Sequence, residues 1–133
     1  MSYKLHEHTA DIRLEATGES LAGLFSETMK AMNAVSCPGF SSEMVERRVE
    51  VSSPDILSLL VDFLNEIVFL GQVHHEDYEE LQTVAVTETH FKGVVKGRKI
   101  ISMEEEIKAV TLHEASVRQT EKGTWLANLV LDI

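Results

Sequence analysis

Two segments place apolar residues at the spacing of a helix that buries one face. Residues 21–35 follow a capping hydroxyl at Ser20 and end before Cys37-Pro38-Gly39. Residues 54–70 begin at Ser53-Pro54-Asp55, with a capping hydroxyl at Ser53, proline in the first turn and an acid at the positive end of the dipole, and we expect them to stop at Gly71. Apolar residues cover more than half the circumference of this second segment, which predicts a central helix packed on a sheet and on the first helix.

Alternating or continuous apolar runs predict strands over much of the remaining chain. The expected strands are residues 4–8, 11–17, 44–51, 80–88, 89–96, 106–112, 114–120 and 124–131, with turns at 96–98 and 121–123. Because helices come early and strands dominate late, the pattern predicts an α+β fold. We expect a single domain over residues 1–133, in which a largely antiparallel sheet of the late and N-terminal strands carries both helices on one face.

Composition narrows the classes of protein to consider. The chain has 133 residues, 44% of them hydrophobic and 26% charged, which is ordinary for one soluble domain. The net charge of -10 argues against a protein that holds nucleic acid by itself, because neutralised phosphates supply most of that affinity. A single cysteine fits a reducing, cytoplasmic setting. We expect no membrane span and no secretory leader.

Candidate chemistry begins at His6-Glu7-His8-Thr9-Ala10-Asp11, a dense polar segment between two expected strands. A His-x-His pair can hold a metal if further ligands come from elsewhere. The alternative, a histidine that bonds the backbone or is solvated, is favoured for His6 and is as good as the metal hypothesis for His8. Asp11 is either a turn cap or an oxygen ligand.

The end of the chain carries a second aspartate in an unusual place. Asp132 follows an apolar run, although strands rarely contain aspartate. An exposed chain end explains it, and so does an oxygen ligand for a hard cation such as calcium or manganese. Lys108 opens the run 109–112 and is either a solvated strand end or a counter-charge and phosphate contact. We expect Asp11, Asp132 and Lys108 to meet in one site, together with the terminal residue.

Other polar groups favour simpler interpretations. His74 and His75 precede two acids, but loop histidines are usually solvated, so a metal cluster there is not favoured. Cys37 has no histidine or basic neighbour, which favours a buried or inert thiol over a nucleophile. Residues 104–106 are most simply a solvated acidic turn, and parity along a strand would place His113 on the face opposite Lys108. The sequence contains no nucleotide-binding fingerprint or nucleophile elbow.

Four short motifs together resemble the archease family, in order and over essentially the whole chain. They are Glu7-His8-Thr9-Ala10-Asp11, Phe63-Leu64-Asn65-Glu66, residues 107–113, and Trp125 with Leu131-Asp132-Ile133. The sequence departs from the family pattern at Leu112, where members commonly have tyrosine, and at Ile101, where some have histidine.

This resemblance implies a small protein cofactor of the tRNA-splicing RNA ligase. That ligase joins a 3′-phosphate or cyclic phosphate end to a 5′-hydroxyl using GTP and manganese, and the cofactor promotes guanylylation of its active-site histidine and multiple turnover. The resemblance also implies a metal site with Asp11, Asp132 and Ile133 as ligands, and a required Lys108. Two alternatives stay open, a small metal-dependent phosphohydrolase using the same aspartates and a general chaperone or interaction module.

Overall fold

A computed structural model describes residues 2–7 and 11–133, with residues 6 and 7 described in their backbone only. Its elements are β1 (Ser2–Glu7), β2 (Asp11–Gly18), α1 (Leu21–Ser36), β3 (Pro38–Ser52), α2 (Ile56–His74), β4 (Glu76–Val86), β5 (His90–Met103), β6 (Ala109–Gln119) and β7 (Trp125–Asp132).

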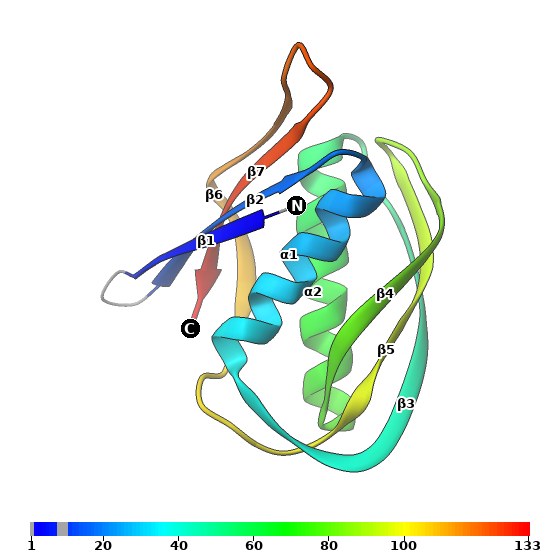
Figure 1. The fold of residues 1–133 in the computed structure, drawn as a ribbon, viewed down its shortest axis with the longest axis vertical. Helices are drawn as coiled ribbons and strands as arrows, with labels where there is room; N and C mark the ends of the chain where they lie inside the picture. Colours follow the sequence, from blue (N-terminus) through cyan, green and yellow to red (C-terminus); the bar gives the residue numbers. More distant parts are fainter. Residues whose placement is uncertain (1, 8–10) are drawn as a thin grey trace.

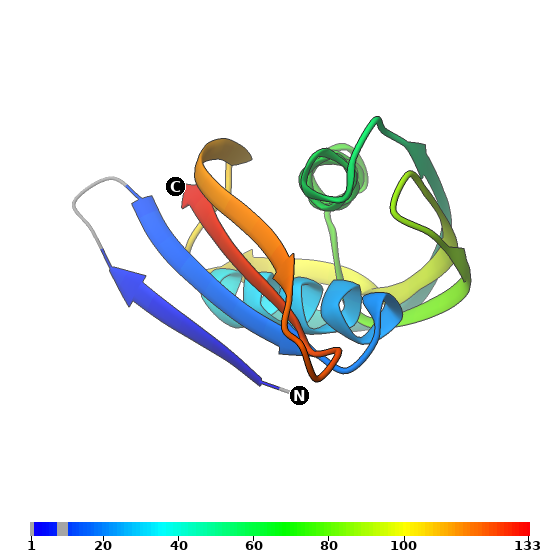
Figure 2. The ribbon, with the colours of Figure 1, turned by 90° about the horizontal axis from the view of Figure 1, so that it is seen from above.

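The strands form two separate antiparallel sheets with both helices between them, as Figures 1 and 2 show. The first sheet has the order β1-β2-β7-β6 and the second the order β3-β5-β4. The predicted α+β class and antiparallel pairing are confirmed, whereas the prediction of one sheet is wrong. Each helix contacts strands of both sheets. Because α2 is apolar around most of its surface, one sheet cannot cover it, and the second sheet buries the remainder.

The aromatic core joins the two helices to the second sheet. Phe25 of α1, Phe63 of α2 and Phe91 of β5 are fully buried, and their ring centroids lie 5.1, 5.2 and 4.6 Å apart in pairs. On the first sheet, alternate residues of β2 face the same core, with Ile12 and Leu14 opposite Leu131 and Leu129. The core therefore occupies the layer between the two sheets.

Helix α2 extends further than its sequence suggests. Asp55 caps its start by accepting a hydrogen bond from the Ser58 N–H at 2.8 Å, so the cap is this carboxylate and not the predicted Ser53 hydroxyl. The predicted stop at Gly71 is wrong, because the helix continues to the left-handed cap His75, whose N–H donates to the Gly71 carbonyl. A Cβ at Gly71 would lie 2.8 Å from the Glu76 carbonyl oxygen, so glycine permits the returning chain to pass close to the helix.

The turn predicted at residues 96–98 is also wrong, since Gly97 lies inside β5 between Val45 of β3 and Tyr78 of β4. A Cβ there would overlap the Asp77 carbonyl oxygen, so the glycine allows close approach of a neighbouring strand. The real β4–β5 turn lies at 87–89, where the Thr87 hydroxyl accepts hydrogen bonds from the N–H groups of Thr89 and His90. The turn predicted at 121–123 is confirmed, and Gly123 has a positive φ of 88°.

Within the described residues, α2 is the one helix long and apolar enough to cross a membrane by length and composition. The expectation that no run reaches such a length is therefore corrected. The central helix of a soluble protein passes the same test, and α2 buries Leu59, Leu60, Phe63 and Leu64 between the sheets.

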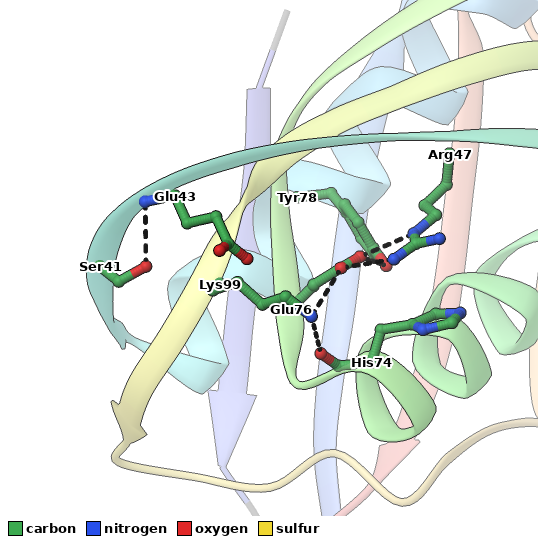
Figure 3. A network of polar contacts seen from close by, with 7 residues as sticks. All are labelled: Ser41, Glu43, Arg47, His74, Glu76, Tyr78 and Lys99. Atoms are coloured by element: carbon green, nitrogen blue, oxygen red, sulfur yellow. Dashed lines mark hydrogen bonds and ion pairs between the residues drawn. The ribbon is translucent and has the colours of Figure 1, made fainter.

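A buried carboxylate ties the three strands of the second sheet together (Figure 3). Glu76 is 2% exposed, and both of its oxygens accept hydrogen bonds from Arg47, at 3.0 and 2.7 Å. The Tyr78 hydroxyl donates to Glu76 at 2.9 Å, and Lys99 lies 3.4 Å away while also donating to the His74 carbonyl. The Arg47 hydrogen bonds lower the pKa of Glu76 from 4.5 to about 2, against the opposing effect of burial. Burial and the Glu76 carboxylate raise the pKa of Tyr78, so its hydroxyl remains a donor.

Truncating the core on α2 should destabilise the protein strongly. Leu60 is 0% exposed, so Leu60→Ala should lower the free energy of unfolding by roughly 2–5 kcal/mol through lost contacts and a cavity. The matched control is Val73→Ala on the same helix, because Val73 is 53% exposed and should change stability little. Urea unfolding of both variants measures the difference, and equal effects would show that the core is misplaced.

The Glu76 network should make stability depend on acid pH. Because folding lowers the pKa of this carboxyl, its stabilisation is complete above the ordinary value of 4.5 and is lost as pH falls towards about 2. Glu76→Gln should therefore cost roughly 3 kcal/mol at neutral pH, at about 1.4 kcal/mol per pKa unit, and the difference from wild type should shrink in acid. Urea unfolding along a pH series measures this. Glu79→Gln is the control, since Glu79 lies on the same strand as Glu76 but forms an exposed ion pair with Arg98 of β5. A constant wild-type-to-Glu76→Gln difference at all pH values would contradict the role given to this carboxylate.

Candidate functional site

The pairing of β2 with β7 places two aspartates directly opposite each other. Asp11, the first residue of β2, is the register partner of Asp132, the last residue of β7, at one end of the first sheet. Directly opposed residues of an antiparallel pair project from the same face. The next pair, Ile12 and Leu131, is buried towards the helices, so the aspartates lie on the outer face. This register confirms that the two aspartates meet, and Figure 2 shows the start of β2 beside the end of β7.

Lys108 reaches the same end of the sheet through its backbone. Its N–H donates to the Asp132 carbonyl at 2.8 Å, and the following residue, Ala109, is the register partner of Asp132. The Lys108 residue is exposed. The structure therefore places the backbone of this lysine against Asp132, immediately before β6.

Ile133 anchors the end of β7, because its side chain is half-buried and packs against the hydrophobic core. A packed side chain at this position holds the main chain next to Asp132 in place. His8 lies outside the described residues, as do Thr9 and Ala10, and the side chain of His6 is not described either. The roles assigned to His8 and to the ligands Asp11, Asp132 and Ile133 stay predictions.

The structure adds an ion pair that sequence reasoning missed. Arg13 lies two residues after Asp11 on the same outer face, and its guanidinium donates to the carboxylate of Glu114. Glu114 lies in an irregular part of β6 and has a positive φ of 53°. The spacing of two residues in the sequence is enough to place Arg13 and Asp11 on the same face of a strand. The sequence does not indicate that Glu114 of β6 pairs with Arg13.

Because of this irregularity, strand parity no longer supports the prediction that His113 lies on the face opposite Lys108. Thr111 pairs with Val130 and Ser116 pairs with Asn128, so four residues of β6 lie opposite Leu129 alone. Parity along a regular strand does not apply across such a bulge. His113 Nε2 lies 3.6 Å from Glu114 Oε1, beside the Arg13 ion pair.

Carboxylates on adjacent strands suit a hard cation. Opposed residues have Cβ atoms about 4.5–5.5 Å apart, close enough for two carboxylates to share an ion, and they repel each other without a counter-charge. Within residues 2–7 and 11–133 no group of three or more His, Cys, Asp or Glu side chains is placed to hold a metal. A cation at Asp11 and Asp132 would therefore need main-chain or water oxygens as well, which calcium and manganese accept.

The other sequence candidates have structural explanations. The His74 carbonyl and the Glu76 side chain belong to the network of the second sheet, and Asp77 accepts a hydrogen bond from the Ser36 hydroxyl at 2.6 Å. Cys37 is exposed rather than buried and caps α1 in the left-handed conformation. Repulsion from the Glu104 carboxylate raises the pKa of the Cys37 thiol, which disfavours the nucleophilic thiolate.

Comparison with known proteins matches this chain to one family. The model of the Archease protein family matches residues 3–133. Protein archease of Methanosarcina mazei is 35% identical, covering 98% of this chain and 95% of its own, and that of Pyrococcus abyssi is 32% identical, covering 96% of each.

Two solved structures share the fold. The solution structure of a Methanobacterium thermoautotrophicum protein has a TM-score of 0.72 at 24% identity, with 98% of each chain covered. The crystal structure of a Thermotoga maritima protein, described as an archease and a possible chaperone, has a TM-score of 0.71 at 24% identity and covers 98% of this chain and 96% of its own. Because the family model and relatives above 30% identity span almost the full length, this chain belongs to the archease family.

Proposed function

We propose that this protein is a non-enzymatic cofactor of a GTP- and manganese-dependent RNA ligase of tRNA splicing. In this role it promotes guanylylation of the ligase and repeated turnover. The observation that carries the proposal is the register pairing of Asp11 with Asp132 next to the backbone of Lys108. Membership of the archease family supports it, and the name of the Thermotoga relative, a possible chaperone, fits a protein that acts on another protein.

The proposed ligands are the carboxylates of Asp11 and Asp132 and a main-chain oxygen of Ile133, with calcium or manganese as the ion. A divalent cation held there supplies positive charge that offsets phosphate oxygens, the usual way such charge is stabilised in phosphoryl transfer. Lys108 would contact a phosphate or offset the two aspartates. The Arg13–Glu114 ion pair lies on the neighbouring surface of the sheet.

The proposed setting is the cytoplasm, and the proposed partner is the ligase rather than its RNA. The net charge of -10 disfavours direct binding of nucleic acid, so the ligase would supply the contacts to RNA. A phosphohydrolase could use the same aspartates on a cation, and a general chaperone would not need them. A phosphohydrolase would be active without the ligase and would lose its activity without the aspartates. A general chaperone would keep its activity when the aspartates are removed.

Metal binding should stabilise the wild-type protein through the aspartate pair. Manganese at about a hundredfold excess over its Kd should add about 2.7 kcal/mol to the free energy of unfolding, seen as a higher Tm. Asp11→Ala and Asp132→Ala should lose this rise, and without metal neither should be less stable than wild type, because each removes one of two opposed like charges. Thermal unfolding in EDTA and in manganese measures both effects. Glu121→Ala, at an exposed turn residue, should keep the rise, and an undiminished rise in both aspartate variants would rule out this metal site.

Ligase stimulation should require the same residues. Asp11→Ala, Asp132→Ala and Lys108→Ala should each abolish stimulation of RNA ligation when RNA is in excess over ligase, while the folded state remains intact. His74→Ala and Cys37→Ser should stimulate nearly as well as wild type, because their side chains lie elsewhere in the fold. The measurement is the number of ligation turnovers per ligase with each variant, after circular dichroism confirms folding.

Two outcomes would redirect the proposal. Full stimulation by both aspartate variants would contradict a role for the metal site even in a genuine ligase cofactor. Phosphoester hydrolysis by the purified protein alone, lost in the aspartate variants, would favour the phosphohydrolase.

A further inference from the structure

A cavity of about 410 Å³ opens between the C-terminal ends of both helices and the end of β5. Its deep wall is apolar and buried, with Met29 and Met32 from α1, Ile67 from α2, and Ile107 from the segment after β5. Its volume lies in the range of binding pockets, and methionine side chains adapt their shape to an incoming group.

Apolar side chains continue from this cavity onto the surface. Ile101 and Met103 line it, and they are 76% and 38% exposed. They lie on the last residues of β5, beyond its pairing with β4, which ends at Lys99. Exposed apolar residues next to an open apolar cavity indicate a surface that another molecule covers.

The rim of the cavity carries acidic residues in an electrostatically unfavourable position. The N–H groups of Glu104 and Glu105 donate to the Ser36 carbonyl at 2.9 and 3.3 Å, which fixes this segment against the C-terminal end of α1. A helix C-terminus carries partial negative charge and is normally accompanied by a cation, but the last turn of α1 has no basic residue. The raised pKa of the Cys37 thiol reports the same local negative potential.

Further carboxylates face the cavity, and the basic residues around them are already engaged. Glu106 and Asp77 line it, and the Asp77 carboxylate is held by the Ser36 hydroxyl. Arg47 and Lys99 on the neighbouring strands are bound to Glu76. Lys108 follows Ile107 directly, so the described residues of the rim combine several negative charges with one lysine.

We propose that this cavity is the docking site for a basic amphipathic segment of the partner protein. An apolar side chain of that segment would enter the methionine-lined cavity, while its lysines and arginines would face Glu104, Glu105 and Glu106. Charge complementarity selects this occupant, because an acidic rim repels nucleic acid and anionic membranes but attracts a cationic peptide. The inference rests on the proposed function, since it assumes that the protein acts by binding another protein.

The place of the cavity in the fold suits that role. Ile107 forms part of its wall, and the next residue, Lys108, donates its N–H to Asp132. A partner segment bound in the cavity would contact Ile107. The residue after Ile107 is hydrogen-bonded to Asp132, so the segment would bind close to the aspartate pair. Docking would hold that pair against the partner without using it for affinity.

The test measures binding of the RNA ligase to wild-type protein and to surface variants by titration calorimetry. Ile101→Asp should raise the Kd at least about tenfold, since it places a charge beside the apolar cavity at a position too exposed to disturb folding. The combined variant Glu104→Lys, Glu105→Lys and Glu106→Lys should weaken binding, more at low than at high salt.

Matched controls separate docking from general surface effects. Met44→Asp alters an apolar residue that is 77% exposed on β3, and Glu121→Lys reverses a charge at the β6–β7 turn. Both should bind as wild type does. Unfolding curves for every variant confirm that each is folded before its binding is compared.

The possible failures are distinguishable. Equal binding by wild type, Ile101→Asp and the charge-reversed variant would overturn this inference and leave the ligase role intact. A wild-type protein that neither binds nor stimulates the ligase would overturn the proposed function, and this inference with it. A small molecule that copurifies with wild type and is lost in Ile101→Asp would identify a ligand pocket and overturn the docking proposal.

Discussion

The two-sided burial of helix α2 is the constraint on which the rest of this structure depends. A helix that is apolar around most of its circumference must be covered from more than one direction, because exposed apolar surface costs free energy in proportion to its area. One sheet, one neighbouring helix and then a second sheet provide that cover. The packed rings of Phe25, Phe63 and Phe91 connect these layers at the centre.

In this arrangement each sheet packs one face against the helices and leaves the other face outside. The groups to which we assign a function lie on an outer face or at the ends of strands and helices. In the first sheet, the chain's first long strand and its last strand are neighbours, and their register opposes Asp11 and Asp132. A slip of one residue would turn one strand over relative to the other and send its aspartate towards the core, so the burial of Ile12 and Leu131 on the other face specifies the register. Core packing and the position of the acidic pair are therefore consequences of the same pairing.

The carboxylates of this protein fall into two groups that differ in how their charge is compensated. Glu76 is buried and held by Arg47, Lys99 and Tyr78, so it stabilises the second sheet. Asp11 faces Asp132, and Glu104 lies against a helix C-terminus, where negative charge is disfavoured. The carboxylates that are placed unfavourably for the isolated fold are the ones to which we assign binding roles. Lys108 connects the two sets along the chain, since it follows Ile107 of the cavity wall and donates its N–H to the Asp132 carbonyl.

The sequence by itself determined the local features of this protein. Helical periodicity and the start signals at Ser20 and 53–55 placed both helices, although the cap of α2 is Asp55 instead of Ser53 and its end was misjudged because Gly71 acts as a contact glycine and not as a stop. Alternation located the strands but misjudged some ends, since β3 and β5 are longer than predicted and the segments 106–112 and 114–120 form the single strand β6. Short motifs carried the resemblance to the archease family. The two aspartates stood out because an acid at the end of an apolar strand is uncommon.

Tertiary structure alone decided how these pieces pair. Division into two sheets, the place of Gly97 inside a strand, the Arg13–Glu114 contact and the cavity beside Ile101 all depend on residues far apart in sequence. Periodicity describes which side of an element is buried, but not which element buries it. That choice is made by the packing of the whole chain around α2, where a glycine, a bulge or a buried carboxylate acquires its role only from the strand or helix that lies next to it.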